Sequence, residues 1–138
     1  MFAQIKTAVE NNRVCPWWMA YTFDNPIRKF FHQPRKMLDA FVKEGMTVMD
    51  VGCGMGFFSI GMAKMVGDSG KVIAVDLQQK MLDIMLKRAR RAGVAERIFP
   101  HRCEPDRLAV SEKVDLSVEV TPIVSADVDK PSAALYFS

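Results

Sequence analysis

Three glycines alternate within the short segment from Met49 to Phe57, which reads MDVGCGMGF. Gly52, Gly54 and Gly56 come directly after an apolar run and directly before a helical pattern. Glycine allows positive φ and lets a ligand approach the backbone, because it has no Cβ. The first turn of the following helix leaves N–H groups unpaired. The spacing therefore predicts a binding loop at the carboxyl end of a strand, where open α/β sheets bind ligands.

A carboxylate follows the glycine loop at the spacing of a neighbouring strand. Asp76 ends the apolar run Lys71–Asp76 and lies 20 residues after Gly56. A carboxylate at this place in a strand–loop–helix–strand unit can accept hydrogen bonds from both hydroxyls of a ribose. A cap of the following helix is the alternative role for Asp76, and the two roles are compatible. Together the loop and Asp76 predict a ligand that contains a nucleoside.

The spacing of the glycines helps to distinguish which nucleoside-containing ligand the loop binds. The dinucleotide fingerprint GxGxxG places pyrophosphate against the start of a helix. Counted from Gly52 or from Gly54, its third glycine falls here on Phe57 or Ser59. Asp50, two residues before the first glycine, would repel pyrophosphate but suits a ligand with an amino group. S-adenosylmethionine has an ammonium, a sulfonium and a ribose, so the charges favour it over NAD or FAD. A nicotinamide oxidoreductase is the less favoured alternative.

The elements that position this loop alternate between helix and strand. In chain order we expect a helix that begins at Pro34 and ends before Gly45, a strand at Thr47–Val51, a helix at Phe57–Val66, a strand at Lys71–Asp76, a helix at Gln78–Ala92, and weaker strands at about 97–102 and 114–120. This order predicts an α/β fold with right-handed crossovers. The fold would be a Rossmann-like parallel sheet of about four strands flanked by helices.

We expect three regions along the chain. Residues 1–33 form an irregular aromatic segment, in which Trp17, Trp18 and Tyr21 either line the pocket or cover apolar surface. Residues 34–120 form the core that binds the ligand. Residues 121–138 form an irregular tail, in which only Ala133–Phe137 could be a short strand.

Composition limits the compartment and the partners. The 138 residues are 49% hydrophobic, and the net charge of +3 is too small to indicate a nucleic-acid partner. Cys15, Cys53 and Cys103 lack the spacing of metal ligands, so we expect no metal site, and scattered thiols suit a reducing cytosol. No segment resembles a secretory signal, and none approaches the roughly 18 uninterrupted apolar residues of a membrane span. We therefore expect a soluble cytoplasmic protein without a membrane partner.

The segments VMDVGCGMGFF and VIAVDLQ resemble the first two motifs of class I S-adenosylmethionine-dependent methyltransferases, and the resemblance extends over residues 35–116. It implies S-adenosylmethionine as the cofactor, Asp50 near its methionine end, and Asp76 on its ribose. Leu77 would pack against adenine, and Glu104, or Asp106 in another register, would accept from the adenine amino group. The residues expected at the cofactor are Asp50, Val51, Gly52, Cys53, Gly54, Gly56, Phe57, Asp76, Leu77 and Glu104.

Two of these assignments have structural alternatives. Asp50 could only orient the loop, and Cys53 is expected to be structural rather than a nucleophile. The resemblance implies methyl transfer to an acceptor, which we expect to be a small molecule. No residue in the sequence can be assigned as a catalytic base. A binding module that has lost its acceptor site, and with it catalysis, is the alternative function.

The chain is incomplete relative to the seven-stranded fold that the resemblance implies. It supplies about four strands, and its tail from 121 does not resemble the family. A strand at 114–120 without a further neighbour would be an exposed apolar edge, which favours association. A truncated or frame-altered product, a fragment, and a homodimer that completes the sheet through this edge are the three explanations that we consider.

Overall fold

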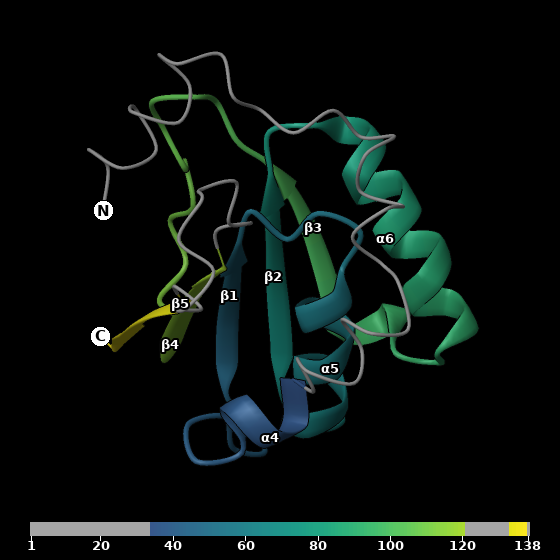
Figure 1. Ribbon diagram of the computed structural model, residues 1–138, viewed down its shortest axis with the longest axis vertical. Coiled ribbons are helices and arrows are strands. Elements are labelled where there is room, and N and C mark those ends of the chain that lie inside the picture. Colours follow the sequence, from purple (N-terminus) through teal and green to yellow (C-terminus); the bar gives the residue numbers. More distant parts are fainter. Residues whose placement is uncertain (1–33, 121–132, 138) are drawn as a thin grey trace, which may run out of the picture.

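A single five-stranded sheet with the order β3-β2-β1-β4-β5 forms the centre of the structure, a computed structural model that describes residues 34–120 and 133–137 (Figure 1). The strands are β1 (Thr47–Val51), β2 (Lys71–Asp76), β3 (Ile98–Arg102), β4 (Leu116–Val120) and β5 (Ala133–Phe137). The helices are α4 (Pro34–Leu38), α5 (Phe57–Val66) and α6 (Gln79–Arg91), and a short 3₁₀ helix, η2 (Ala95–Arg97), precedes β3. The aromatic segment at 1–33 lies outside the described residues.

The predicted fold class is confirmed. β1 pairs in parallel with β2 and with β4, and β2 pairs in parallel with β3. Two of the strands, β1 and β2, have the bounds that the sequence predicts. Both are runs of apolar residues that are buried almost throughout, as expected for central strands of a parallel sheet.

The expectation that the fourth strand would be an exposed edge is wrong. β5 pairs with β4 in antiparallel register, from Leu116 opposite Phe137 to Val120 opposite Ala133. The paired backbone groups of β5 occupy the side of β4 that the sequence interpretation left open. Among the described strands, β3 and β5 are the edges of the sheet. The edge of the fourth strand, through which a homodimer was predicted, is thus occupied by β5, and dimerisation itself stays a prediction.

The first helix is shorter than predicted. α4 ends at Leu38, although the apolar pattern continues to Val42. The backbone N–H groups of Phe41 and Val42 both donate to the Leu38 carbonyl, at 2.9 and 2.8 Å, which closes a turn instead of extending the helix. Val42 is still buried, but Phe41 is 37% exposed. The turn directs the chain to Gly45, whose positive φ of 84° leads into β1.

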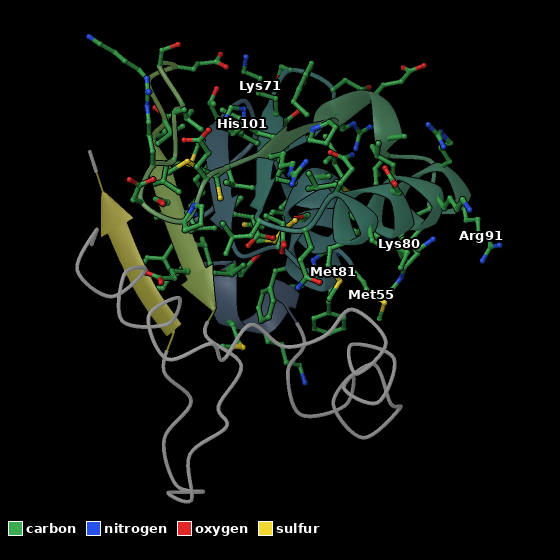
Figure 2. All side chains as sticks on the ribbon, turned by 90° about the horizontal axis from the view of Figure 1, so that it is seen from above. Met55, Lys71, Lys80, Met81, Arg91 and His101 are labelled. Atoms are coloured by element: carbon green, nitrogen blue, oxygen red, sulfur yellow. The ribbon has the colours of Figure 1, made fainter. Side chains whose placement is uncertain are left out.

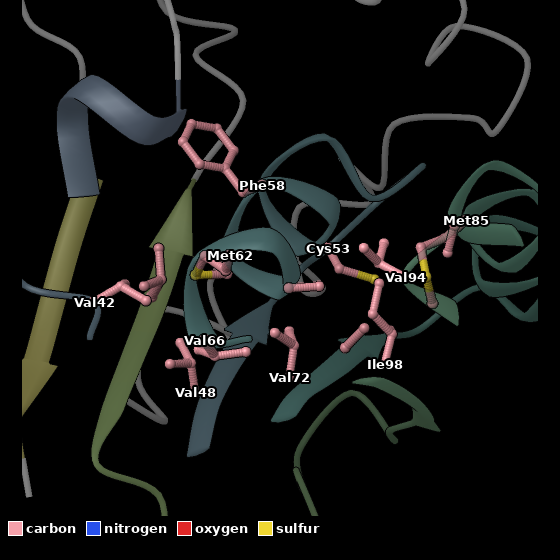
Figure 3. Packing of buried hydrophobic residues seen from close by; sticks show 14 of the residues in the cluster. Val42, Val48, Cys53, Phe58, Met62, Val66, Val72, Met85, Val94 and Ile98 are labelled. Atoms are coloured by element: carbon pink, nitrogen blue, oxygen red, sulfur yellow. The ribbon is translucent and has the colours of Figure 1, made fainter. Parts of the chain in front are cut away.

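The helices pack on one face of the sheet and bury the larger part of the core. Figure 3 shows Met62 and Val66 of α5 against Val48 of β1, all three of them fully buried. Met85 of α6 belongs to the same cluster. The outer side of α6 carries Lys80 and Arg91, which point away from the sheet (Figure 2). Each such apolar side chain contributes about 1.5–3 kcal/mol by burial, so this layer holds the helices on the sheet.

The opposite face of the sheet has a smaller apolar cluster. It consists of Met49, Val51, Ile73, Val75 and Leu108. Among the described residues no helix contributes to this cluster, and the segment between β3 and β4 packs there through Leu108. The two faces of the sheet therefore differ in their covering.

None of the helices in the described ranges is long and apolar enough to cross a membrane.

Candidate functional site

The glycine loop joins β1 to α5 and has the backbone conformation that its glycines predict. Gly52, Gly54 and Gly56 have φ of 73°, 55° and 83°, in the left-handed region that disfavours other residues. A Cβ at Gly56 would lie 2.3 Å from the Cγ of Met85, so this glycine allows α5 and α6 to pack closely. A Cβ at Gly52 or Gly54 would meet no other described atom within 4 Å. The first two glycines therefore leave open space beside the backbone.

Hydrogen bonds hold the loop over the end of β2. The N–H groups of Gly52 and Cys53 both donate to the Val75 carbonyl, at 2.8 and 3.0 Å. The N–H of Gly54 donates to Asp76 Oδ2 at 2.9 Å. The two features that the sequence singled out, the loop and the acid 20 residues later, are thus in direct contact at the carboxyl edge of the sheet.

Asp76 connects the loop to the helix that follows it. Its Oδ1 accepts a hydrogen bond from the Gln78 N–H at 2.9 Å, directly before α6, while Oδ2 accepts from Gly54. Asp76 is not the N-cap of α6, because that position is Gln78 and no side chain caps the helix; the bond from the Gln78 N–H closes a turn directly before it. Burial raises the pKa of Asp76, and the N–H groups of Gln78, Gly54 and Leu77 lower it in part. A carboxylate has about four acceptor positions, so both oxygens can accept a further hydrogen bond.

Asp50 points to the helical face of the sheet and supports the start of α5. It is 2% exposed, and its Oδ2 accepts a hydrogen bond from Ser59 Oγ at 2.5 Å. The pKa of Asp50 is raised from 3.8 to about 6, mainly because the carboxyl is buried; the hydroxyl and the backbone N–H of Ser59 offset part of the rise, and the charge of Asp76 adds to it. Because Gly56, the N-cap of α5, has no side chain, Asp50 supplies an acceptor for the first turn of this helix.

Cys53 is placed as a structural residue. Its side chain is 8% exposed and lies within the helical-face cluster. Burial raises the pKa of the Cys53 thiol well above its ordinary value, and the charges of Asp50 and Asp76 raise it further. The thiol is therefore neutral and unreactive at neutral pH, because the thiolate is the nucleophilic form.

The remaining predicted residues surround the loop and Asp76 at different depths. Val51 is buried on the face opposite the helices, Phe57 begins α5 and is half-buried, and Leu77 is half-buried directly after Asp76. The N–H of Cys103 donates to the Asp76 carbonyl at 3.1 Å, so the chain after β3 continues along the end of β2.

Glu104 follows Cys103 in a tight turn at the same edge. Its N–H donates to the Arg107 carbonyl at 3.0 Å, and the Arg107 N–H donates back at 3.2 Å. Both Glu104 and Asp106, the alternative in another register, are exposed. The structure therefore brings Glu104 to the edge where the glycine loop lies.

Sequence reasoning missed two residues that support the loop. Ser59 is fully buried and hydrogen-bonded to Asp50, and Met85 packs where a Cβ on Gly56 would lie. A polar residue in the otherwise apolar helix FFSIGM was the available signal for Ser59.

A family model described as a methyltransferase domain matches residues 42–131. The chain belongs to this family, and its fold and glycine loop are those of a class I S-adenosylmethionine-dependent methyltransferase. The chain is 35% identical to a SAM-dependent methyltransferase of known structure from Aquifex aeolicus, with a TM-score of 0.60. That alignment covers 66% of this chain and 48% of the other. The family and this solved structure accordingly indicate S-adenosylmethionine as the cofactor of the chain.

Two curated relatives are also methyltransferases by name. A demethylmenaquinone methyltransferase from Lactobacillus johnsonii is 39% identical over 71 residues, which are 51% of this chain and 27% of that protein. A probable cobalt-precorrin-6B C(15)-methyltransferase (decarboxylating) from Pyrobaculum calidifontis is 31% identical over 96 residues, 64% of this chain and 49% of that protein. The chain thus spans about half or less of the length of these relatives.

Proposed function

We propose that this chain binds S-adenosylmethionine across the carboxyl ends of β1 and β2 and takes part in transfer of its methyl group to a small-molecule acceptor. The contact between the Gly54 N–H and Asp76 carries the proposal, because it brings an open glycine backbone beside an acid with free acceptor positions. The named relatives, which methylate demethylmenaquinone and a cobalt-precorrin, support a small molecule as the acceptor.

In this proposal the cofactor contacts are divided among the loop, β2 and β3. The backbone at Gly52 and Gly54 receives the methionine moiety, because a ligand can approach where no Cβ intervenes. Asp76 accepts from the ribose hydroxyls, and Glu104 accepts from the adenine amino group. The other residues proposed to border the cofactor are Asp50, Val51, Cys53, Gly56, Phe57 and Leu77.

The chemistry of the methyl group belongs to the cofactor, whose sulfonium makes the methyl carbon electrophilic. The contribution of the chain is to hold loop and carboxylate in fixed positions through the hydrogen bonds of Gly52, Cys53 and Gly54. Such positioning can account for a large part of an enzymatic rate enhancement. The methyltransferase names of the relatives favour catalysis over a module that only binds.

Isothermal titration calorimetry with S-adenosylmethionine, S-adenosylhomocysteine and NADH tests the cofactor assignment. We expect binding of the first two ligands and no binding of NADH, since the loop lacks the third glycine of the dinucleotide fingerprint. The full 138-residue chain is titrated at neutral pH. If millimolar S-adenosylmethionine gives neither heat nor thermal stabilisation, the proposal is wrong. Tight binding of NADH would instead indicate an oxidoreductase.

A further inference from the structure

A cavity of about 510 Å³ lies at the amino ends of β1, β2 and β3. Thr47 and Lys71, the first residues of β1 and β2, line it together with Phe99 of β3. The other walls come from the turn between α5 and β2 and from the segment between α6 and β3. Sites for small molecules commonly have volumes of about 300–1,000 Å³. The cavity is therefore large enough to hold a small molecule.

This cavity is separate from the proposed cofactor site. β2 begins at Lys71 in the cavity and ends at Asp76 beside the glycine loop. Residues along a strand are about 3.3 Å apart, so the two ends of β2 are about 17 Å from each other. Figure 2 shows Lys71 and Met55, a residue of the glycine loop, on opposite sides of the molecule. A small molecule in the cavity is therefore not in contact with the methyl group of the cofactor.

Phe99 gives the cavity an aromatic surface. It is 49% exposed, although most large apolar side chains among the described residues are buried. Phe99 is opposite Ile73 in the register of β2 and β3, so it shares a face of the sheet with Lys71, two residues before Ile73. The Lys71 Nζ lies 5.3 Å from the centre of the Phe99 ring. A planar ring that stacks on Phe99 is thus brought next to a positive charge.

Two cations border the cavity in positions that other contacts fix. Arg97 donates a hydrogen bond from Nη1 to the Ala63 carbonyl at 3.1 Å, and its side chain is 24% exposed. Lys71 is held over the Phe99 ring, and its side chain is 32% exposed. Both positive charges are therefore in place before a ligand arrives.

The acids that pair with these cations are more exposed than the cations themselves. Asp68, the partner of Arg97, is 95% exposed, and Glu112, the partner of Lys71, is 46% exposed. Glu96, which also lines the cavity, is exposed as well. Exposed ion pairs contribute little to stability, so their acidic partners can move away at low cost. An anion from outside can therefore take the place of a carboxylate of the chain.

We propose that this cavity is a second ligand site, which binds a small aromatic carboxylate. The ring of the ligand stacks on Phe99, and its carboxylate pairs with Lys71 in place of Glu112. Arg97 adds a second positive charge to the same cavity. The site lies at the edge of the sheet opposite to the glycine loop and does not depend on the proposed function.

Amide NMR spectra of the isotope-labelled full chain with three probes test this site. The probes are naphthoate, naphthylmethylamine, which has the same ring with a positive charge, and acetate, which has the charge without a ring. Naphthoate should shift the amide signals of Lys71, Gly93 and Phe99, all of which line the cavity. The other two probes at the same concentration should leave these signals in place. Shifts by naphthylmethylamine or acetate equal to those by naphthoate, or no shift by naphthoate, would overturn the proposal.

Two pairs of variants test the contacts of the ring and of the carboxylate. Phe99→Ala should weaken naphthoate by about 5-fold or more, because the stacking surface is lost. Phe41→Ala, which shortens an exposed phenylalanine outside the cavity, should bind like the wild type. Glu112→Gln should strengthen naphthoate by about 2- to 5-fold, because the competing carboxylate is gone. Asp83→Asn, which removes the same charge from the exposed side of α6, should have no effect.

The variants also separate this site from the cofactor site. Phe99→Ala and Glu112→Gln should bind S-adenosylmethionine with the affinity of the wild type, since neither residue lies near the glycine loop. Unchanged or weaker naphthoate binding in Glu112→Gln would show that the ligand does not replace this carboxylate, and it would contradict the proposal. Failure of the wild type to bind S-adenosylmethionine while it binds naphthoate would contradict the proposed function alone.

Discussion

The buried acids around β1 differ in their hydrogen bonding. Asp50 of β1 and Asp76 of β2 are buried and accept hydrogen bonds within the chain, from Ser59 and from Gly54 and Gln78 respectively. On the β4 side, Glu119 Oε2 is buried and no described residue bonds to it. The glycine loop is therefore held in shape by its own hydrogen bonds, whereas β4 has a buried oxygen without a partner among the described residues. The difference shows that polar contacts fix the loop between β1 and β2, while they do not satisfy the acid at the end of β4.

The largest effect on stability is expected at the glycines of the loop. Gly56→Ala should destabilise the fold by about 2–5 kcal/mol, because a positive φ and overpacking against Met85 add together. Gly52→Ala has the strain without the clash and should cost about 1–2 kcal/mol. Urea unfolding of the two variants measures both values.

The same glycine variants also predict a change in affinity for S-adenosylmethionine. Gly52→Ala should weaken S-adenosylmethionine in calorimetry, since the new methyl group enters the space beside the loop backbone. Equal stability of the two variants would show that Gly56 does not set the packing of α5 against α6. Undiminished affinity in Gly52→Ala would remove Gly52 from the site.

The raised pKa of Asp50 predicts a pH-dependent stability. Folding raises this pKa from 3.8 to about 6, so the folded protein binds more protons than the unfolded chain between these values. Stability should therefore fall as pH rises through this interval, by up to about 3 kcal/mol. Asp76, whose pKa is also raised by burial, contributes in the same direction.

Asp50→Asn isolates this effect, because the amide does not titrate. The free energy of unfolding of this variant should depend less on pH between about 4 and 6 than that of the wild type. Urea titrations at several pH values give the comparison, with Asp83→Asn on the exposed side of α6 as control. A profile that Asp50→Asn leaves unchanged would assign the pH dependence to other groups.

The smallest effect is expected at the opposite edge of the sheet. Lys71, the first residue of β2, pairs with Glu112, and both side chains are substantially exposed, at 32% and 46%. Exposed ion pairs contribute at most about 1 kcal/mol. Glu112→Gln should therefore change the melting temperature little, and less still in high salt. A large loss of stability would show that the amino edge is also held by polar contacts.

Sequence patterns were sufficient where the local signal and the tertiary structure agree. β1 and β2 have their predicted bounds, because each is an apolar run that ends at a loop. The positive φ of Gly52, Gly54 and Gly56 also follows from their spacing.

The remaining features depend on contacts between segments far apart in sequence. β5 has the bounds of the short strand that the sequence allowed at Ala133–Phe137, but no pattern in the tail indicates its antiparallel pairing with β4. The end of α4 at Leu38 depends on a turn that the apolar spacing does not reveal. The bond from Ser59 to Asp50 and the unpaired oxygen of Glu119 are properties of packing, so a sequence can only mark these residues as polar.

The most direct measurement of the central claim is the affinity of Asp76→Ala for S-adenosylmethionine, determined by calorimetry at a temperature where circular dichroism shows the variant folded. The account predicts a dissociation constant about 5- to 150-fold higher than that of the wild type, which corresponds to about 1–3 kcal/mol for polar groups left unpaired. Asp83→Ala, on the exposed side of α6, should bind like the wild type. Wild-type affinity in a folded Asp76→Ala protein would contradict the account.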